Sequence, residues 1–528
     1  MHTRRKYQLI SVIALLFAVL NLVYALEPIP DVAQTPLLLS PTTQSNVVIL
    51  LDDSSSMDFE VMTADNLSAG LFFAPNPDGS GLSTDTITHR PGCELRSAAL
   101  GGYAYGIAAS TNVYKDTTGG NCYVAAEDAW RFRCSAYNSL YYNPGEIYQP
   151  WVGTRSDGVE FSDIQADFTA APLDPSDPNS DTVNLIAPDP VTGIDAFRFY
   201  TCTRTDDAGS QAFQVETETI ITEDYPELQN FYNWFVYHRS RHLRAKSLLG
   251  EFVADEIGTR IGLTGFNLTS LPVAEMTRSI LSDDKLALLQ TLYSSKPVVQ
   301  EGAVNTSSPL ADRYQATHDY LACEASSAFP GSTATEPGNP ACPALATPAG
   351  SCQPNHIIIA TDGFYNRISG VDDYDADDGT NPFDGGFLAD GIANTLADKA
   401  ISFYKEDLHS VLQDDVTPDF LDRIYYRATP SFVSLADDAG LHQHIKTHAV
   451  TFDSGFLSSQ IRSSIWYDPS AFNLGLVKDL FHATINSRGQ YFDFNRSRQN
   501  QLSNLSTTVS AGISSTTPVA INTQAVEQ

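Results

Sequence analysis

The sequence NVVILLDDSSS, residues 46–56, joins an unbroken aliphatic run to an acidic and serine-rich stretch. A run without polar alternation predicts a strand that is buried on both faces, as in a parallel sheet covered by helices. The polar residues from Asp52 onward then form a loop at the carboxyl end of this strand. Ligands of open α/β sheets bind at that edge, so the sequence predicts a polar site there.

The same pattern recurs in HIIIATDG, residues 356–363, where an aliphatic run ends at Thr361 and Asp362. Around these two runs, strand-like and helix-like patterns alternate from residue 228 onward. We expect strands at 260–268, 445–452 and 490–494, and helices at 228–258, 285–293, 310–323, 392–412, 476–485 and 501–513. This alternation predicts an α/β fold with a doubly wound, mostly parallel sheet.

Composition divides the rest of the chain. Residues 58–228 are rich in glycine, proline, aspartate and tyrosine and lack a long helical period, which predicts a large irregular insertion. Its aromatic-rich stretch 137–151 is expected to pack a core rather than to stack on sugars. The expected order is a signal peptide (1–25), a linker (26–45), the first strand and metal loop (46–57), the insertion (58–228), the remainder of the α/β domain (229–513) and a polar tail (514–528).

The first residues have the pattern of a secretory signal peptide, with an uncleaved membrane anchor as the alternative. Arg4, Arg5 and Lys6 precede an apolar run at 9–23, and a small residue follows at Ala25. Export predicts a location in the periplasm or at the cell surface, where an oxidising environment favours disulfides. Seven cysteines leave one thiol unpaired; they are Cys93, Cys122, Cys134 and Cys202 in the insertion, and Cys323, Cys342 and Cys352 after it.

The charge balance narrows the class of partner. The formal net charge is -32, from 31 basic and 63 acidic residues. This argues against nucleic acid, which needs a positive surface, and favours divalent cations. The sequence also lacks the G-x-S-x-G, H-E-x-x-H and G-x-x-x-x-G-K motifs, so it predicts a binding protein rather than an enzyme.

Oxygen-bearing side chains gather at the predicted sheet edge. A D-x-S-x-S pattern follows the first buried strand, and its alternate residues point the same way. A second carboxylate follows the other buried strand, and a hydroxyl just before an expected helix completes the set. The predicted ligands are Asp52, Ser54, Ser56, Ser308 and Asp362, with Thr306 as the alternative to Ser308. Such oxygens suit a hard divalent cation, Mg²⁺ first, with Mn²⁺ and Ca²⁺ as alternatives.

An acidic run follows the second strand end. Asp373, Asp375 and Asp377 have the spacing of the first ligands of a calcium-binding loop, and Asp384 falls at its last position. The glycine that such loops need is replaced by Asp378, so a second cation site and a solvated acidic loop both remain open. Three neighbouring histidines, which we expect to be structural rather than ligands of a transition metal, are His442, His444 and His448.

The predicted ligand set resembles the metal-ion-dependent adhesion site (MIDAS) of von Willebrand factor A domains. In that family an aspartate, two serines, a threonine and a second aspartate hold one divalent ion, partly through water. One coordination position stays open for a carboxylate of the partner. Ser308 would take the place of the usual threonine, and the residues that match are Asp52, Ser54, Ser56 and Asp362.

Longer segments are similar to the amino-terminal region of the PilC/PilY family of type IV pilus tip-associated proteins. They occur in the family's order and are LLDDSSSM, YNSLYYNPGEIYQPW, NFYNWFVYHRSRHLRAKSLL, IIIATDGFYN, NTLADKAISFYKEDL and DLFHATINSRGQYFDF. The resemblance implies export, a role in pilus assembly and retraction, and adhesion to surfaces or host cells. No segment matches the carboxyl-terminal β-propeller with which family members usually continue.

The expected function is that of an exported bacterial type IV pilus-associated assembly and adhesion protein with a divalent-metal-dependent site. The resemblance implies pilins, minor pilins or a surface or host-cell ligand as partners, with membrane contact only through the signal segment before its cleavage. The alternatives are a secreted A-domain adhesin unrelated to pili, a scaffold that the metal stabilises, and a hydrolase with a dispersed active site. The insertion starts directly after the first metal loop, which predicts that it shapes the choice of partner.

Overall fold

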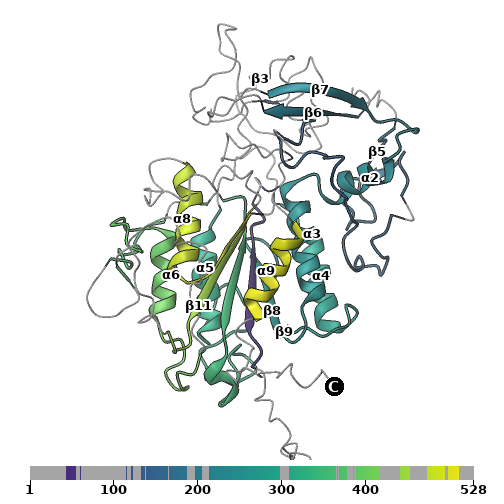
Figure 1. The fold of residues 1–528 in the computed structure, drawn as a ribbon. Coiled ribbons are helices and arrows are strands. Elements are labelled where there is room, and N and C mark those ends of the chain that lie inside the picture. The colour runs from purple at the N-terminus through teal and green to yellow at the C-terminus, as the bar shows by residue number, and fades with distance from the viewer. Residues whose placement is uncertain are drawn as a thin grey trace, which may run out of the picture. The chain divides into compact units, whose positions relative to one another are not determined.

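A computed structural model describes residues 43–54, 57, 60, 114–115, 121–122, 133–136, 138–163, 166–186, 197–204, 213–297, 308–363, 365–366, 368–376, 384–385, 388–416, 440–451, 473–493 and 498–510. A six-stranded sheet has the strand order β12-β11-β10-β1-β8-β9 (Figure 1). Its strands are β1 (Asn46–Leu51), β8 (Arg260–Gly265), β9 (Leu271–Glu275), β10 (Asn355–Ala360), β11 (Ile445–Thr451) and β12 (Tyr491–Asp493).

Most of this sheet is parallel, as the sequence predicts. β1 pairs in parallel with β10 on one side and with β8 on the other, and β11 and β12 extend the parallel array beyond β10. Every residue of β1 and β10 is buried. The edge strand β9 pairs antiparallel with β8 and is not predicted from the sequence. It is short and half-exposed, and it contains Pro272, which a sheet edge tolerates.

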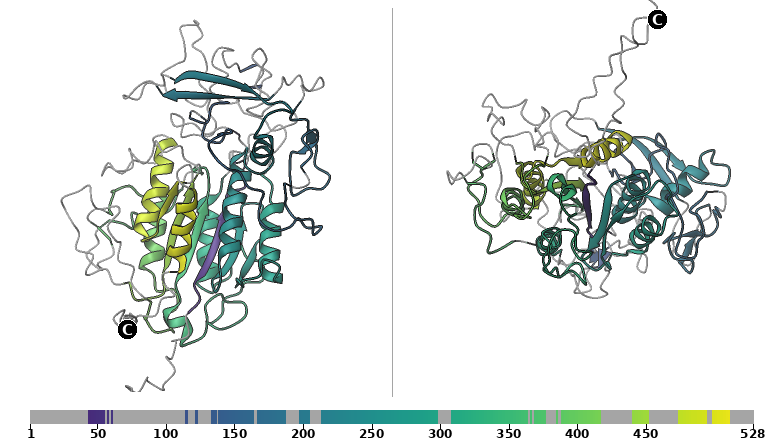
Figure 2. Two further views of the ribbon diagram at one scale, coloured as in Figure 1. Left: turned by 45° about the vertical axis from the view of Figure 1, so that its right-hand side comes forward. Right: turned by 90° about the horizontal axis from the view of Figure 1, so that it is seen from below.

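Helices cover both faces of the sheet (Figure 2). Val47 and Ile49 join a core with α2 (Leu228–Tyr237), α3 (Arg241–Asp255), α4 (Asp283–Ser294) and α9 (Arg498–Ser510). Val48 and Leu50 join the opposite core with α5 (Leu310–Leu321), α6 (Leu396–Lys405) and α8 (Asn473–Asn486). Alternate residues of one strand therefore anchor two helical layers.

The helix expected at 228–258 consists of two helices, α2 and α3, with a break at residues 238–240. Ser240 is extended, and its hydroxyl accepts a hydrogen bond from the amide of Leu243 at 3.3 Å, which begins α3. Arg239 donates from Nε to Glu60 at 2.9 Å and from Nη1 to the Phe235 carbonyl at 2.7 Å. Apolar residues continue through both helices, so periodicity alone does not reveal the break.

The helix expected at 392–412 is also shorter than predicted, because α6 begins only at Leu396 and ends at Lys405. Thr395 and Asp398 form a reciprocal capping box at its start, and the backbone is extended at Glu406. The remaining expected helices and strands are present, with ends that differ by a few residues.

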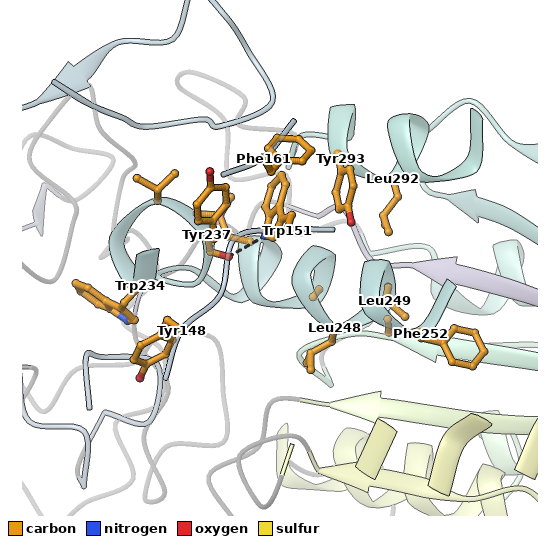
Figure 3. Packing of buried hydrophobic residues seen from close by; sticks show 14 of the residues in the cluster. Tyr148, Trp151, Phe161, Trp234, Tyr237, Leu248, Leu249, Phe252, Leu292 and Tyr293 are labelled. Carbon is orange, nitrogen blue, oxygen red and sulfur yellow. Dashed lines mark hydrogen bonds between the residues drawn. The ribbon is translucent and has the colours of Figure 1, made fainter. Parts of the chain in front are cut away.

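Aromatic packing organises the described part of segment 58–228. Trp151 stacks on Tyr293 of α4 with ring centroids 4.8 Å apart, and its indole donates to the Tyr237 carbonyl at 3.0 Å (Figure 3). Tyr141 and Tyr148 are buried as well, so this stretch packs a core as expected; Tyr137 lies outside the described residues. The strands here pair antiparallel and are β2 (Tyr114–Lys115), β3 (Asn121–Cys122), β4 (Ala171–Pro172), β5 (Thr182–Val183), β6 (Arg198–Arg204) and β7 (Phe213–Ile220).

Two disulfides join described residues. They link Cys134 to Cys202 and Cys323 to Cys342, while Cys352 is a free thiol. Disulfides in both parts of the chain agree with the expectation from an exported protein. Cys93 lies outside the described residues.

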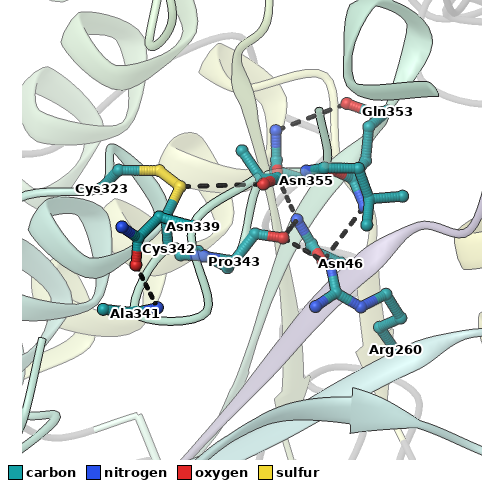
Figure 4. The surroundings of a disulfide bond; sticks show 11 residues. Asn46, Arg260, Cys323, Asn339, Ala341, Cys342, Pro343, Gln353 and Asn355 are labelled. Atoms are coloured by element: carbon teal, nitrogen blue, oxygen red, sulfur yellow. Dashed lines mark hydrogen bonds between the residues drawn. A yellow bond between two sulfur atoms is a disulfide. The ribbon is translucent and has the colours of Figure 1, made fainter. Parts of the chain in front are cut away.

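Polar side chains tie together the amino ends of the three central strands near the Cys323–Cys342 disulfide (Figure 4). Asn46 donates to Asn355 Oδ1 at 3.0 Å, and Arg260 donates to Asn46 Oδ1 at 3.0 Å. Beside them, Ser45 Oγ donates to the Val509 carbonyl at 2.9 Å, which joins the start of β1 to the end of α9. Among the described helices none is long and apolar enough to cross a membrane, and the predicted signal segment lies outside them.

Candidate metal centre at the carboxyl edge of the sheet

The ends of β1 and β10 bring the first predicted ligands together. The two strands are in register with Leu51 opposite Ala360, so Asp52 follows one strand end and Asp362 follows the other. Thr361 Oγ1 donates to Asp52 Oδ2 at 2.7 Å, and the Ser54 amide donates to Asp52 Oδ1 at 2.9 Å. Asp52 is fully buried, so its carboxylate is held in one orientation by both loops.

The neighbouring Asp53 binds the loop after β8. It accepts hydrogen bonds from the Phe266 amide at 2.9 Å and from the Asn267 amide at 3.1 Å, which anchors the loop that follows β8. Burial raises the pKa of Asp53, and these hydrogen bonds oppose the rise. Of the two consecutive aspartates, the second therefore binds the loop after the adjacent strand β8 and does not face Asp362 as a ligand.

The electrostatics of the edge are set by two carboxylates and one guanidinium. Burial, followed by the nearby charge of Asp362, raises the pKa of Asp52 to about 7. Arg241, at the start of α3, donates to Asp362 Oδ2 at 2.5 Å, and both side chains are inaccessible to solvent. Burial lowers the pKa of Arg241, and the charge of Asp362 opposes this effect. With both carboxylates ionised, the edge carries a net negative charge that a divalent cation would offset.

Arg241, which pairs with Asp362, is the residue of this sheet edge that the sequence did not single out. The sequence places it in the middle of an expected helix, where a basic side chain most often faces water. The break at residues 238–240 starts a new helix here and turns Arg241 toward the sheet edge. The signal that could have found it is Ser240, an N-cap residue directly before a basic side chain.

Ser308 lies beside the loop that Asp362 begins. Its amide donates to Asn366 Oδ1 at 3.0 Å, and the Asn366 amide donates back to the Ser308 carbonyl at 2.9 Å. The Ser308 hydroxyl is buried and has no hydrogen-bond partner among the described residues. A buried hydroxyl without a partner is costly, and a bound ion or water would satisfy it. Ser56 and Thr306 lie outside the described residues.

The acidic run after β10 folds against α6 and α8. Asp373 and Asp375 lie with Asp398 in a group whose oxygen atoms are within 4.8 Å of one another, and Asp375 also groups with Asp390 and His482. Asp384 instead pairs with Lys405, and Asp377 lies outside the described residues. Burial raises the pKa of Asp375 to about 7, although the charge of His482 opposes the rise. The residues that the sequence did not connect with this run are Asp390, Asp398 and His482.

The three neighbouring histidines behave as structural residues. His442 Nε2 lies 2.7 Å from the Tyr404 carbonyl, and His448 Nε2 lies 3.0 Å from His356 Nδ1. Burial, followed by the charge of Lys446, lowers the pKa of His448 to about 3 and that of His444 well below its usual value. Within the described parts of the chain, no group of metal-ligating side chains includes any of the three.

Comparison with known proteins gives one consistent result. Two proteins described as type IV pilus biogenesis factor PilY1, from Pseudomonas aeruginosa strains PAO1 and PAK, are each 23% identical to the chain. The first match covers 450 residues, 73% of this chain and 37% of that relative, and the second covers 296 residues, 50% and 24%. The chain thus spans well under half the length of these relatives. No family model matches, and no solved structure matches.

Proposed function

Because the chain is related to the PilY1 biogenesis factors, as its sequence motifs predict, we propose that it is an exported type IV pilus-associated assembly and adhesion protein. Its sheet is a von Willebrand factor A-like module, and a divalent cation at Asp52 completes the surface that a partner binds. It acts as a binding protein without catalytic activity. The partner belongs to the pilus, a pilin or minor pilin, or lies on a surface that the pilus touches.

Topology supports the A-like module. From the central β1 the chain first adds β8 and β9 on one side, and later adds β10, β11 and β12 on the other. The direction of winding therefore reverses between β1 and β10. Open α/β sheets bind their ligands at such a switch point, beyond the carboxyl ends of the strands. Asp52 and Asp362 follow these two strand ends.

The orphaned hydroxyl of Ser308 is the observation that carries the metal proposal. Together with Asp52, Ser54 and Asp362 it offers the hard oxygen donors that Mg²⁺ or Mn²⁺ takes in proteins. A bound divalent cation would supply an open coordination position for an acidic group of the partner. Asp52 would hold it in the ionised form, and Arg241 would keep Asp362 oriented from the opposite side.

A thermal melt tests this proposal directly. The protein is stripped with chelator and then melted with Mg²⁺, Mn²⁺ or Ca²⁺, beside an Asp52→Ala, Ser54→Ala double variant. At one hundred times its dissociation constant, a ligand adds about 2.7 kcal/mol to the free energy of unfolding. We expect this gain for the wild type but not for the double variant. The control is Asp157→Ala, which should show the same gain as the wild type, because Asp157 is an exposed residue of segment 58–228 that pairs with Arg155. No gain in the wild type would contradict metal binding.

The buried Arg241–Asp362 pair favours one alternative, a scaffold in which charge balance serves stability alone. Binding to purified type IV pili separates the two functions. For an adhesion site, chelator or the double variant abolishes pilus binding while the protein stays folded. If pilus binding survives both chelator and the double variant, the metal site serves only as a scaffold. If pilus assembly is equal with and without the gene, the protein is an adhesin unrelated to pili.

A further inference from the structure

The loop between β10 and α6 meets α8 at a cluster of polar side chains away from Asp52. Asp375 and Asp390 come from the loop, and His482 and Asn486 lie one turn apart on α8. Ligand atoms of Asp375, Asp390 and His482 lie within 4.8 Å of one another. The Asp390 amide donates to Asp375 Oδ1 at 3.2 Å, so the two carboxylates are held together by the backbone of the loop.

The hydrogen bonds of His482 leave an electrostatic conflict. Its Nε2 lies 2.7 Å from the Leu388 carbonyl, which can only accept, so Nε2 carries the proton. In the neutral ring Nδ1 then presents a lone pair, and it lies 3.4 Å from Asp390 Oδ2. A lone pair that faces a buried carboxylate is repelled unless a cation or a second ring proton lies between them.

Asn486 provides an independent sign of an occupant. Its side chain is fully buried, and Nδ2 donates to Asp375 Oδ2 at 2.9 Å and to the Ala397 carbonyl at 3.3 Å. The same amide group leaves Oδ1 buried without a hydrogen-bond partner among the described residues. An amide oxygen withdrawn from water without a partner is unfavourable, and this one belongs to the same amide group that contacts Asp375.

We propose that Asp375, Asp390, His482 and Asn486 form a second divalent-cation site that takes a borderline first-row cation, Mn²⁺ or Zn²⁺, in preference to Mg²⁺ or Ca²⁺. Two carboxylates and an amide oxygen suit Mn²⁺, and an imidazole suits Zn²⁺. The site differs from the one at Asp52, whose donors are all oxygens.

Such an ion would fasten the loop that begins at Asp362 to α8. That loop is already attached to α8 through Asp479, which accepts a hydrogen bond from Tyr365 Oη in the loop and two more from the amides of Leu396 and Ala397 at the start of α6. A cation at Asp375 would add a second attachment farther along the loop. The second site would thereby help to position Asp362 without contacting the partner. This positioning role rests on the proposed function, whereas binding of a cation at Asp375 does not.

Pulsed electron paramagnetic resonance of bound Mn²⁺ separates the two sites, because only the second offers a nitrogen ligand. We expect ¹⁴N coupling from an imidazole in the stripped and Mn²⁺-loaded wild type, and in the Asp52→Ala, Ser54→Ala variant. His482→Gln, whose amide can still donate to the Leu388 carbonyl, should lose the coupling and weaken Mn²⁺ or Zn²⁺ binding by about tenfold or more. The matched control is His318→Gln, since His318 also bridges two carboxylates, Asp319 and Glu406, and should retain both properties.

Two results would overturn the inference. One is a wild type without imidazole coupling and with equal affinity for Mn²⁺, Zn²⁺, Mg²⁺ and Ca²⁺. The other is His482→Gln that binds Mn²⁺ as the wild type does. In either case the contacts of His482 with Asp375 and Asp390 serve the fold alone. The double variant measures the metal response of the Asp52 site independently.

Discussion

At the scale of single residues, Asp52, Asp362 and Arg241 share one buried end of the sheet. Arg241 and Asp362 are paired at 2.5 Å, so the charge left without an opposite partner is that of Asp52. Protonation or a bound cation can neutralise it, and the two compete for the same oxygen atoms. If the proposed cation binds, pH and metal concentration would therefore act on the same residue.

Removing metal should make stability depend on pH through Asp52. The folded-state pKa of about 7 lies above the ordinary value of 3.8, so the folded protein holds this proton more tightly. The associated stability is complete below about pH 4 and is lost as pH rises through 7, by up to about 1.4 kcal/mol per pH unit. In chelator, denaturant unfolding should show the wild type losing stability relative to Asp52→Asn across this window. Parallel pH profiles of the two proteins would contradict the assignment.

Replacing Arg241 should increase the amount by which a divalent cation raises the free energy of unfolding. Arg241→Gln leaves Asp362 buried without its partner, which costs about 3–5 kcal/mol of unfolding free energy. Because a divalent cation can replace the lost positive charge, Mg²⁺ should restore more stability in this variant than it adds to the wild type. Thermal melts with Mg²⁺ or chelator measure the difference.

Arg239→Gln is the matched control. Arg239 lies two residues before Arg241 and forms a buried ion pair of its own, with Glu60. The variant should lose a similar amount of stability without any added rescue by Mg²⁺. Equal rescue of both variants would show that the metal stabilises the fold in general and does not compensate for Arg241 at the sheet edge.

At the scale of helices and strands, the sequence predicts elements whose pattern is local. The aliphatic runs of β1 and β10, buried throughout, are evident from their composition, and so is the polar edge at Asp52 and Asp362. The break before Arg241 is less evident, because apolar residues continue through both helices and only Ser240, which caps α3, marks it. The cluster around His482 joins a loop to a helix about a hundred residues further on, and such contacts leave no periodic signal.

The aromatic packing between segment 58–228 and helices α2 and α4 should be strongly stabilising. Trp151→Ala removes a stacked ring and a hydrogen bond to the Tyr237 carbonyl, so we expect a loss of about 3–5 kcal/mol in denaturant unfolding. Ile147→Ala, four residues away and 80% exposed, should change stability by about 0.5 kcal/mol or less. A small effect of Trp151→Ala would mean that this segment packs only loosely on the helices.

At the scale of the whole molecule, the two disulfides between described cysteines restrain the unfolded chain. They close loops with sequence separations of 68 residues for Cys134–Cys202 and 19 residues for Cys323–Cys342. Loop entropy predicts losses of about 4 and about 3 kcal/mol when each is replaced by a pair of serines. Unfolding without reductant measures them, and Cys352→Ser, at the free thiol, should leave stability nearly unchanged. Equal stability of all variants would mean that the unfolded chain stays compact without these links.

The contact between Ser45 and Val509 has a mechanical consequence. It joins the start of β1 to the end of α9, on the side opposite the carboxyl ends where Asp52 lies. A force applied to the chain at Ser45 and Val509 would act on two neighbouring points of the fold. It would therefore not shear the six strands against one another. Such a pull would bear on the amino ends of the strands and would leave the edge at Asp52, at their carboxyl ends, without load.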